Sequence, residues 1–266
     1  MSCKKIFPSL LASALLASCA LQNVATGLEK YQQAVTRYEA KDYYQASQLL
    51  EEALPQLRGK KEEVAIHFYR AYCDFHQKKY EQSAARFKYF RETFVRDHRQ
   101  EKALYMQAYA LYKASPYVTL EQVRTQEAVC ILRDYLQQYP EGEHTEKARE
   151  QLDELDKKLA LKDFTIGKLH SQLAQYKAAV VTLGNFQQAF PDSSYSEEAA
   201  YLKADAQHRY FKTVQEEDEK KGQLSKAIKY CQEFLDNYPN SPYVSKVEAI
   251  YTSIATAQDP VTANNT

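Results

Sequence analysis

The chain has 266 residues, of which 35 are basic and 35 are acidic, so its formal net charge is zero. This balance excludes the basic footprint that nucleic-acid-binding proteins carry, and we expect no nucleic-acid partner. Only 6 glycines and 8 prolines interrupt a composition rich in alanine, leucine, glutamine, glutamate and lysine, which favours an almost wholly helical chain.

The first residues have the pattern of a cleavable signal peptide. Lys4 and Lys5 supply positive charge, and the mostly apolar residues 6–16 follow them. This apolar run is shorter than the about 20 residues that a membrane-spanning helix needs. The segment is therefore predicted to be a targeting signal rather than a membrane span.

Small residues before Cys19 indicate how the signal is removed. The sequence Leu-Ala-Ser-Cys at 16–19 resembles the bacterial lipobox, in which the cysteine sulfur is acylated and the peptide is cut just before it. We predict a lipoprotein signal peptide at residues 1–18 and a lipid anchor on Cys19; ordinary secretory cleavage after Ser18 is the alternative. Because Ala20 lacks the aspartate-type signal that retains lipoproteins in the inner membrane, we expect the outer membrane, with the chain facing the periplasm.

The mature chain contains internal repeats. Three segments begin with alanine and end with proline twelve residues later, at 128–140, 179–191 and 227–239. Two weaker copies begin at Ala46 and Ser83. A twelve-residue interval that recurs in this way is not expected from unrelated amphipathic helices.

A small residue precedes three of the five starts by twelve residues, namely Ala34, Ala71 and Gly167. Small residue, alanine, large apolar residue and proline, in this order, form the tetratricopeptide pattern: the small pair lets two antiparallel helices touch, and proline ends the second helix. We predict an all-α tetratricopeptide-repeat superhelix of about five irregular helix pairs. A C-terminal capping helix follows Pro242, and residues 258–266 are predicted to be a disordered tail.

The repeats are longer than the about 34 residues of an ideal copy, and the excess marks insertions. Eight extra residues lie within 113–126, between the two helices of the third pair. Residues 214–222 are polar and charged, and we predict a solvated loop there. A heptad-like apolar series predicts one extended or gently broken helix before the fourth pair. Its members are Ala148, Leu152, Leu155, Leu159, Ile166, Leu169 and Leu173.

Three cysteines remain after the predicted lipidation site. Their odd number and wide spacing do not match a disulfide framework or a zinc site. We therefore expect Cys73, Cys130 and Cys231 to be small residues of the apolar core.

No motif of catalytic chemistry occurs. The glycines stand alone and the histidines are scattered, so neither a phosphate-binding loop nor a hydrolase motif is present. Glu141, Glu143 and His144 lie close together, but two flexible carboxylates and one imidazole are more typical of a solvated helix start than of a metal site. We predict no enzyme activity, no metal, no cofactor and no small-molecule substrate.

The remaining candidate site is the concave surface that the first helices of stacked pairs line. Counting from the small residue as position eight, which is Ala34, Ala71 and, in the third pair, Ala108, positions two, five, nine and twelve of the first three pairs carry eight aromatic side chains. They are Tyr31, Tyr38, Phe68, Tyr72, Phe75, Tyr105, Tyr109 and Tyr112. We predict that this row binds an extended peptide, because tyrosine gives a large contact area at a small entropy cost. The alternative is that the rings pack between neighbouring repeats.

The signal, the irregular repeats and their insertions together resemble the BamD family, the lipoprotein subunits of the β-barrel assembly machinery. The most specific pieces are residues 49–63, 103–128 and 159–202. The resemblance implies a non-catalytic scaffold. Its N-terminal repeats, residues 19–113, would receive unfolded outer-membrane proteins, and its C-terminal repeats, residues 114–257, would dock a BamA-type barrel subunit.

The chain differs from the family pattern at one position, and two other classes of protein are alternatives to the BamD family. Other family branches carry an arginine where this chain has Thr182. A different tetratricopeptide-repeat envelope lipoprotein, acting as a cell-wall or transport adaptor, would share the fold but should lack the Ser115-Pro116…Leu120 insertion. A glycan-capturing lipoprotein would use tryptophan platforms, and this chain has no tryptophan.

Overall fold

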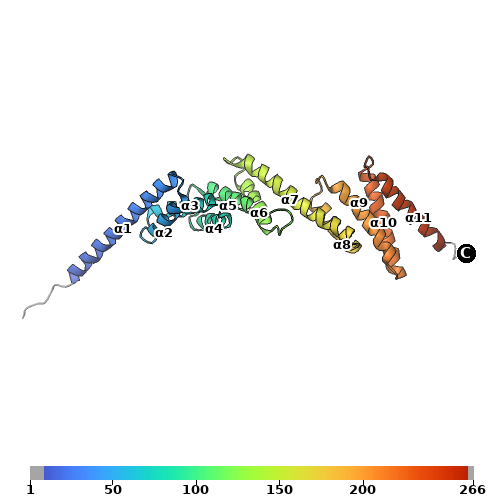
Figure 1. The fold of residues 1–266 in the computed structure, drawn as a ribbon, viewed down its shortest axis with the longest axis horizontal. Coiled ribbons are helices and arrows are strands. Elements are labelled where there is room, and N and C mark those ends of the chain that lie inside the picture. The colour runs from blue at the N-terminus through green and yellow to red at the C-terminus, as the bar shows by residue number, and fades with distance from the viewer. Residues whose placement is uncertain (1–8, 263–266) are drawn as a thin grey trace, which may run out of the picture. The chain divides into compact units, whose positions relative to one another are not determined.

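A computed structural model describes residues 9–262, with side chains described from 22 to 256. The predicted acceptor side chain of Cys19 therefore lies outside the described residues. Every regular element of the described chain is a helix (Figure 1). The helices are α1 (Ser9–Glu39), α2 (Tyr43–Ala53), α3 (Lys61–His76), α4 (Tyr80–Thr93), α5 (Gln100–Ala114), α6 (Val123–Gln138), α7 (Thr145–Gln172), α8 (Tyr176–Ala189), α9 (Ser196–Thr213), α10 (Glu217–Asn237) and α11 (Val244–Thr262).

The helices form the five predicted pairs. Consecutive helices pack as α1 with α2, α3 with α4, α5 with α6, and α9 with α10. The second half of α7 packs on α8 through an apolar cluster that includes Phe164, Leu183 and Phe186. Helix α11 covers α9 and α10 as the predicted cap. The all-α tetratricopeptide-repeat fold is confirmed.

Small residues set the contact inside each pair, as the sequence predicted. Ala34 and Ala46 are both fully buried between α1 and α2. In the second pair the Ser83 hydroxyl donates a hydrogen bond of 2.8 Å to the carbonyl oxygen of Ala71 on the facing helix. A side chain can reach the opposite backbone in this way only because neither position carries a large group.

Three pairs share one turn between their helices. Lys41, Lys78 and Ala174 each adopt a positive φ of about 60°, two residues before the second helix begins. The amide that follows each of them bonds to a carbonyl five residues earlier, which is the Schellman closure of a helix C-terminus. These are the three pairs in which the sequence places a small residue twelve positions before the repeat start. The third and fifth pairs, which have insertions, do not use this turn.

The described chain divides into two compact units. One consists of the residues up to 116 together with 122–153, and the other of residues 117–121 together with those from 154 onward. Both helices of the third pair lie in the first unit, whereas the sequence-based division placed a boundary after residue 113. The functional division into a client-binding and a docking half stays a prediction.

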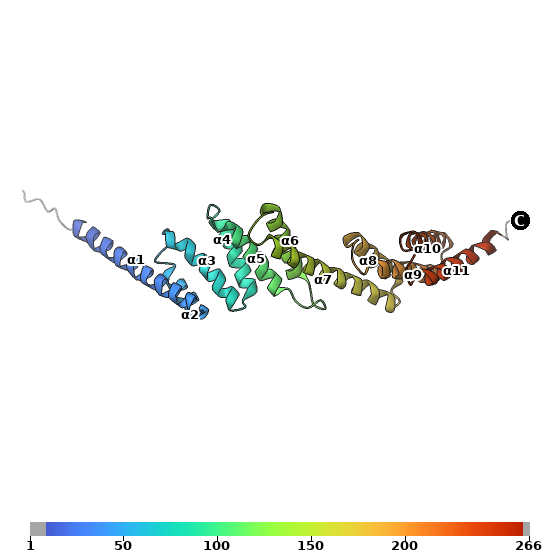
Figure 2. The ribbon, with the colours of Figure 1, turned by 90° about the horizontal axis from the view of Figure 1, so that it is seen from above.

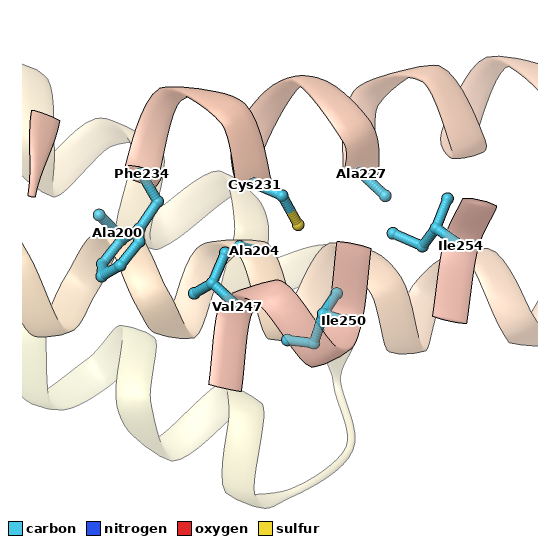
Figure 3. Packing of buried hydrophobic residues seen from close by; sticks show 8 residues of the cluster. All are labelled: Ala200, Ala204, Ala227, Cys231, Phe234, Val247, Ile250 and Ile254. Carbon is cyan, nitrogen blue, oxygen red and sulfur yellow. The ribbon is translucent and has the colours of Figure 1, made fainter. Parts of the chain in front are cut away.

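Each unit has its own apolar core. In the first unit, Leu50, Leu57 and Ile66 are buried among the first three helices. In the second, Cys231 lies between Ala227 and Phe234 on α10, and Figure 3 shows it in one cluster with residues of α9 and α11. Burial raises the pKa of the Cys231 thiol to about 11, as expected of a packing cysteine.

Two predictions about individual segments are wrong. Only residues 214–216 of the predicted loop 214–222 lie outside a helix, because α10 begins at Glu217. Its first turn is acidic, which suits the positive end of a helix, and the Glu216 carboxylate accepts hydrogen bonds from the amides of Asp218 and Glu219. Cys73 is buried like Cys231, but Cys130 is exposed and is not a core residue.

The heptad-like series does form one long helix, α7, of 28 residues (Figure 1 and Figure 2). Helix α11 extends to Thr262 and so overlaps the first residues of the predicted tail. The disorder predicted for residues 258–266 otherwise stays a prediction. Within the described part of the chain, no helix combines the length and the apolar character needed to cross a membrane.

Gly167 and Gly184 allow a matched test of the close helix contact. A Cβ atom on Gly167 would lie 2.6 Å from Cδ2 and 2.8 Å from Cγ of the fully buried Leu183, whereas a Cβ atom on Gly184 meets nothing within 4 Å. Gly184→Ala should raise the free energy of unfolding by about 0.5–1 kcal/mol through backbone entropy. Gly167→Ala should instead lower it by about 1–3 kcal/mol through overpacking. Denaturant unfolding measures both, and equal stabilisation by the two substitutions would contradict the close contact.

Candidate functional site

A cleft of about 550 Å³ opens in the first unit. Helices α1, α3 and α5 and the beginning of α7 supply its walls. Most of its lining side chains are aromatic or cationic, and none is acidic. They are Tyr38, Phe68, Tyr69, Tyr72, Lys102, Tyr105, Met106, Tyr109, His144, Lys147 and Gln151.

Five of the eight predicted site residues line this cleft, namely Tyr38, Phe68, Tyr72, Tyr105 and Tyr109. Two of them also belong to the core, since Phe68 is 8% exposed and Tyr105 is 5% exposed. Phe68 packs against the rings of Phe87 and Phe90 on α4. Side chains of the aromatic row therefore line a groove, as predicted, and some of them also pack between helices, as the alternative interpretation held.

The other three predicted residues lie beside the cleft. The Phe75 ring contacts the Tyr109 ring at 5.2 Å, and Tyr112 stacks on Tyr109 at 6.0 Å. Tyr31 is half-buried against the core of the first pair. Phe75 and Tyr112 thus support the Tyr109 ring, and none of the three side chains lines the cleft itself.

The aromatic rings form a continuous series of contacts across α1, α3 and α5, which are the first helices of the first three pairs. Tyr38 contacts His76 at 6.2 Å, and His76 contacts both Tyr72 and Phe75. Phe75 then leads to Tyr109, which stacks on Tyr105 at 5.8 Å. The series predicted from repeat positions is present, with the additional ring of His76 joining α1 to α3.

Helix α7 and the residue just before it contribute side chains to the cleft that the sequence did not predict as site residues. His144 stacks on Tyr105 at 4.1 Å, and the Gln151 side-chain amide donates to the Tyr105 hydroxyl at 3.2 Å. Lys147 lies between them in the chain and also lines the cleft. Counting repeat positions from Gly167 placed the first helix of the fourth pair further along the chain, so the count could not include these residues. Their spacing of three and four residues, on one face of a helix, was the available signal.

The turn before α7 is fixed to α5 and α6. The Tyr135 hydroxyl donates to a Glu101 carboxylate oxygen at 3.0 Å and accepts a bond from the backbone amide of His144 at 3.1 Å. The same Glu101 oxygen accepts from the amide of Glu143 at 2.9 Å. Burial lowers the pKa of His144, against the opposing effect of Glu143. The imidazole therefore favours its neutral form beside Tyr105.

Two buried polar atoms of lining residues have no partner within the described chain, the Tyr72 hydroxyl and the Gln151 side-chain carbonyl oxygen. Burial raises the pKa of Tyr72, so its hydroxyl keeps its proton at neutral pH. One atom can donate a hydrogen bond and the other can accept one. A peptide group, which carries one acceptor and one donor, would match this pair chemically, but both atoms are buried and a ligand would reach them only after neighbouring side chains move.

Glu141, Glu143 and His144 are the residues that the sequence analysis considered for a metal site. Among the described residues, no three or more His, Cys, Asp or Glu side chains are grouped in a way that would hold a metal ion. His144 stacks on a ring, and the Glu143 side chain is 73% exposed.

Comparison with known families identifies the chain. A family model described as YfiO, outer membrane lipoprotein, matches residues 25–192 and 172–257. The chain belongs to this family. Outer membrane protein assembly factor BamD of Caulobacter vibrioides is 28% identical to the chain over 104 residues, which are 39% of this chain and 34% of that protein. The aligned stretch thus spans about a third of the relative, and the resemblance to the BamD family is confirmed.

Solved structures similar to this YfiO-family chain include two tetratricopeptide proteins. One is a TPR repeats protein from Bacteroides fragilis, with 13% identity, coverage of 87% of this chain and 98% of that chain, and a TM-score of 0.41. The other is the TPR domain of P58(IPK), with 15% identity, coverage of 93% and 59%, and a TM-score of 0.42.

Acidification should destabilise the protein, and His144 should account for part of the loss. Because burial lowers the pKa of His144, the folded chain binds a proton less readily than the unfolded chain, whose histidines have a pKa of about 6.5. The free energy of unfolding should be retained above about pH 6.5 and fall as the pH drops through that value. His144→Phe keeps a ring against Tyr105 but cannot titrate.

Denaturant unfolding at about pH 7 and about pH 5 measures this difference. The His144→Phe protein should lose less stability between the two pH values than the unsubstituted protein. Three other histidines with lowered pKa values, His67, His76 and His208, remain in both proteins and serve as the common background. An equal loss in both proteins would mean that His144 titrates normally.

Proposed function

We propose that this chain is a non-catalytic scaffold lipoprotein of the β-barrel assembly machinery. A lipid on Cys19 anchors it in the outer membrane, and its repeats face the periplasm. The aromatic cleft of the first unit binds unfolded outer-membrane proteins, and the C-terminal repeats dock a BamA-type barrel subunit. Membership of an outer-membrane lipoprotein family and similarity to an assembly factor support this proposal.

The observation that carries the client-binding role is the chemistry of the cleft. An unfolded outer-membrane protein presents an extended strand with aromatic side chains and free backbone groups. The cleft offers ring faces from Tyr38, Tyr72 and Tyr109, and its unpartnered hydroxyl and amide oxygen match a peptide group. Lys102 and Lys147 add positive charge without an opposing carboxylate in the lining. The family resemblance assigns the client's C-terminal targeting strand to this half of the chain.

The docking role rests on the family resemblance and on the exposed surface of the second unit. Thr182, which stands where other branches have arginine, lines a shallow pocket between α8 and α9 with Tyr176 and Tyr210. Val181 beside it is 57% exposed. The threonine cannot form the ion pair that an arginine would form. Contact with the barrel subunit in this chain therefore depends more on apolar and aromatic side chains than on charge.

Two substitutions at Tyr72 test the client-binding role. Tyr72→Ala removes a ring that contacts Phe68 and Phe87, and should weaken binding of a client's C-terminal peptide by about 2 kcal/mol or more. Tyr72→Phe removes only the unpartnered hydroxyl. Its stability should be unchanged or slightly higher, because a buried unsatisfied group costs about 1–3 kcal/mol. Its peptide affinity should nevertheless fall, because the proposed strand displaces the side chains that cover this hydroxyl and accepts its hydrogen bond.

Fluorescence anisotropy with a labelled peptide gives the affinities, and thermal melting gives the stabilities. If Tyr72→Ala lowers the melting temperature while the remaining folded protein binds peptide normally, the row serves packing alone. If Tyr72→Phe binds like the unsubstituted protein, the hydroxyl plays no part in recognition.

The anchor is tested at Cys19. Cys19→Ala should abolish incorporation of labelled palmitate and leave the protein unprocessed or released from membranes, because a lipid with several acyl chains provides the lasting attachment. Membrane fractionation after labelling measures both effects. Normal labelling of the variant would refute the assignment of the acceptor cysteine.

A further inference from the structure

One apolar stripe runs along α7, but only part of it is covered. Its positions alternate in steps of four and three residues from Ala148 to Leu173, and Lys162 occupies the single polar position. Within the second unit, Leu155 is 1% exposed, whereas Ile166, Leu169 and Leu173 are 36%, 49% and 59% exposed. Leu173 continues the helical geometry, because its amide bonds to the Leu169 carbonyl at 2.9 Å. The apolar stripe therefore continues through a part of the sequence where its side chains are exposed. We call this exposed part, which consists of Ile166, Leu169 and Leu173, the open seam.

The open seam is separate from the face that α7 uses in its own pair. Phe164 and Gly167 face α8, where Phe164 packs against Phe186 and Gly167 approaches Leu183. The three exposed residues are not part of that apolar cluster. Helix α7 thus has two apolar faces in the second unit, one paired and one unpaired.

The tip of the third-pair insertion lies at the upstream end of the seam. Residues 117–121 belong to the same unit, and the Lys162 ammonium donates to the Thr119 carbonyl oxygen at 3.0 Å. The tip carries two more exposed apolar side chains, Tyr117 at 83% and Leu120 at 55%. A partner lying along the seam would meet this tip next to the polar position.

The spacing of the seam selects the kind of partner. Steps of three and four residues match a second helix, whereas an added strand would require a period of two. An ammonium has three donors, and Lys162 uses one of them on Thr119, so it can still pair with a carboxylate. A polar group at one seam position is a known device for selecting a partner and its register.

A second copy of the chain is a poorer occupant. Three side chains pairing with three others would bury far less than the about 1,200 Å² at the lower end of stable protein interfaces. A different protein can cover the seam and the insertion tip together.

We infer that Ile166, Leu169 and Leu173 bind an amphipathic helix of a different protein, which places an acidic residue opposite Lys162. This inference rests on the proposed docking role of the C-terminal repeats. It adds to that role a second surface, on α7 and separate from the pocket at Thr182, and a recognition mode in which a partner helix completes the interrupted seam.

The test uses the purified full-length mature chain and a synthetic helix of about three heptads with leucine at the seam positions and glutamate beside them. Anisotropy of the labelled helix should show saturable binding. A twin helix with lysine in place of glutamate should bind at least about tenfold more weakly. No saturable binding, or equal binding of the twin, would overturn the inference.

Two matched variants locate the contact. Leu169→Glu and Val95→Glu introduce the same charge at positions that are 49% and 69% exposed, so neither should disturb the core. Leu169→Glu should weaken binding of the glutamate helix by about tenfold or more, and Val95→Glu, in the first unit, should leave it nearly unchanged. Equal effects of the two variants would contradict the assignment to α7. A dimer in sedimentation that Leu169→Glu dissolves would contradict it too, because a second copy would then be the occupant.

Co-purification of the BamA-type subunit separates this inference from the proposed function. If the unsubstituted chain recovers that subunit and Leu169→Glu recovers it equally well, the α7 seam is wrong and the docking role stands. If the unsubstituted chain does not recover it, the docking role itself fails, whatever the helix binds.

Discussion

The whole arrangement depends on the close approach of two antiparallel helices at a position where no large side chain fits. In the second pair this approach is short enough for the Ser83 hydroxyl to bond to the Ala71 backbone. In the fourth pair, Gly167 leaves the space that Leu183 fills. Because each pair closes at this point, the remaining faces of the first helices point in related directions. Aromatic residues at equivalent positions therefore come together as one surface.

That surface combines stability with the capacity to bind. Phe68 and Tyr105 are buried and hold the rings in place, while Tyr38, Tyr72 and Tyr109 keep part of their surface open. Rings fixed in this way lose little entropy when a peptide arrives, which favours affinity. His144 lines the cleft, and the network at Glu101 and Tyr135 fixes the position of the turn that carries it. In the proposed function, binding and packing are thus two uses of the same side chains.

The sequence predicted the pairs well because their contacts require specific small residues at a fixed interval, as at Ala34 and Ala46. It predicted the site less completely. Lys147 and Gln151 lie on a helix longer than a standard repeat, so a count from Gly167 could not place them. Cys130 was assigned to the core by residue type alone, whereas its position on α6 turns it outward. Local sequence specifies where helices touch, but insertions decide which additional elements reach a shared surface.

The central claim is that the cleft of the first unit is the place where a client strand binds. Nuclear magnetic resonance titration of the full mature chain with a client's C-terminal peptide tests it most directly. The account predicts saturable shifts in the amide signals around Tyr72, Tyr105 and Lys147, with the signals of α9 to α11 unchanged. Shifts confined to the second unit, or saturable binding that leaves the cleft signals unmoved, would contradict it.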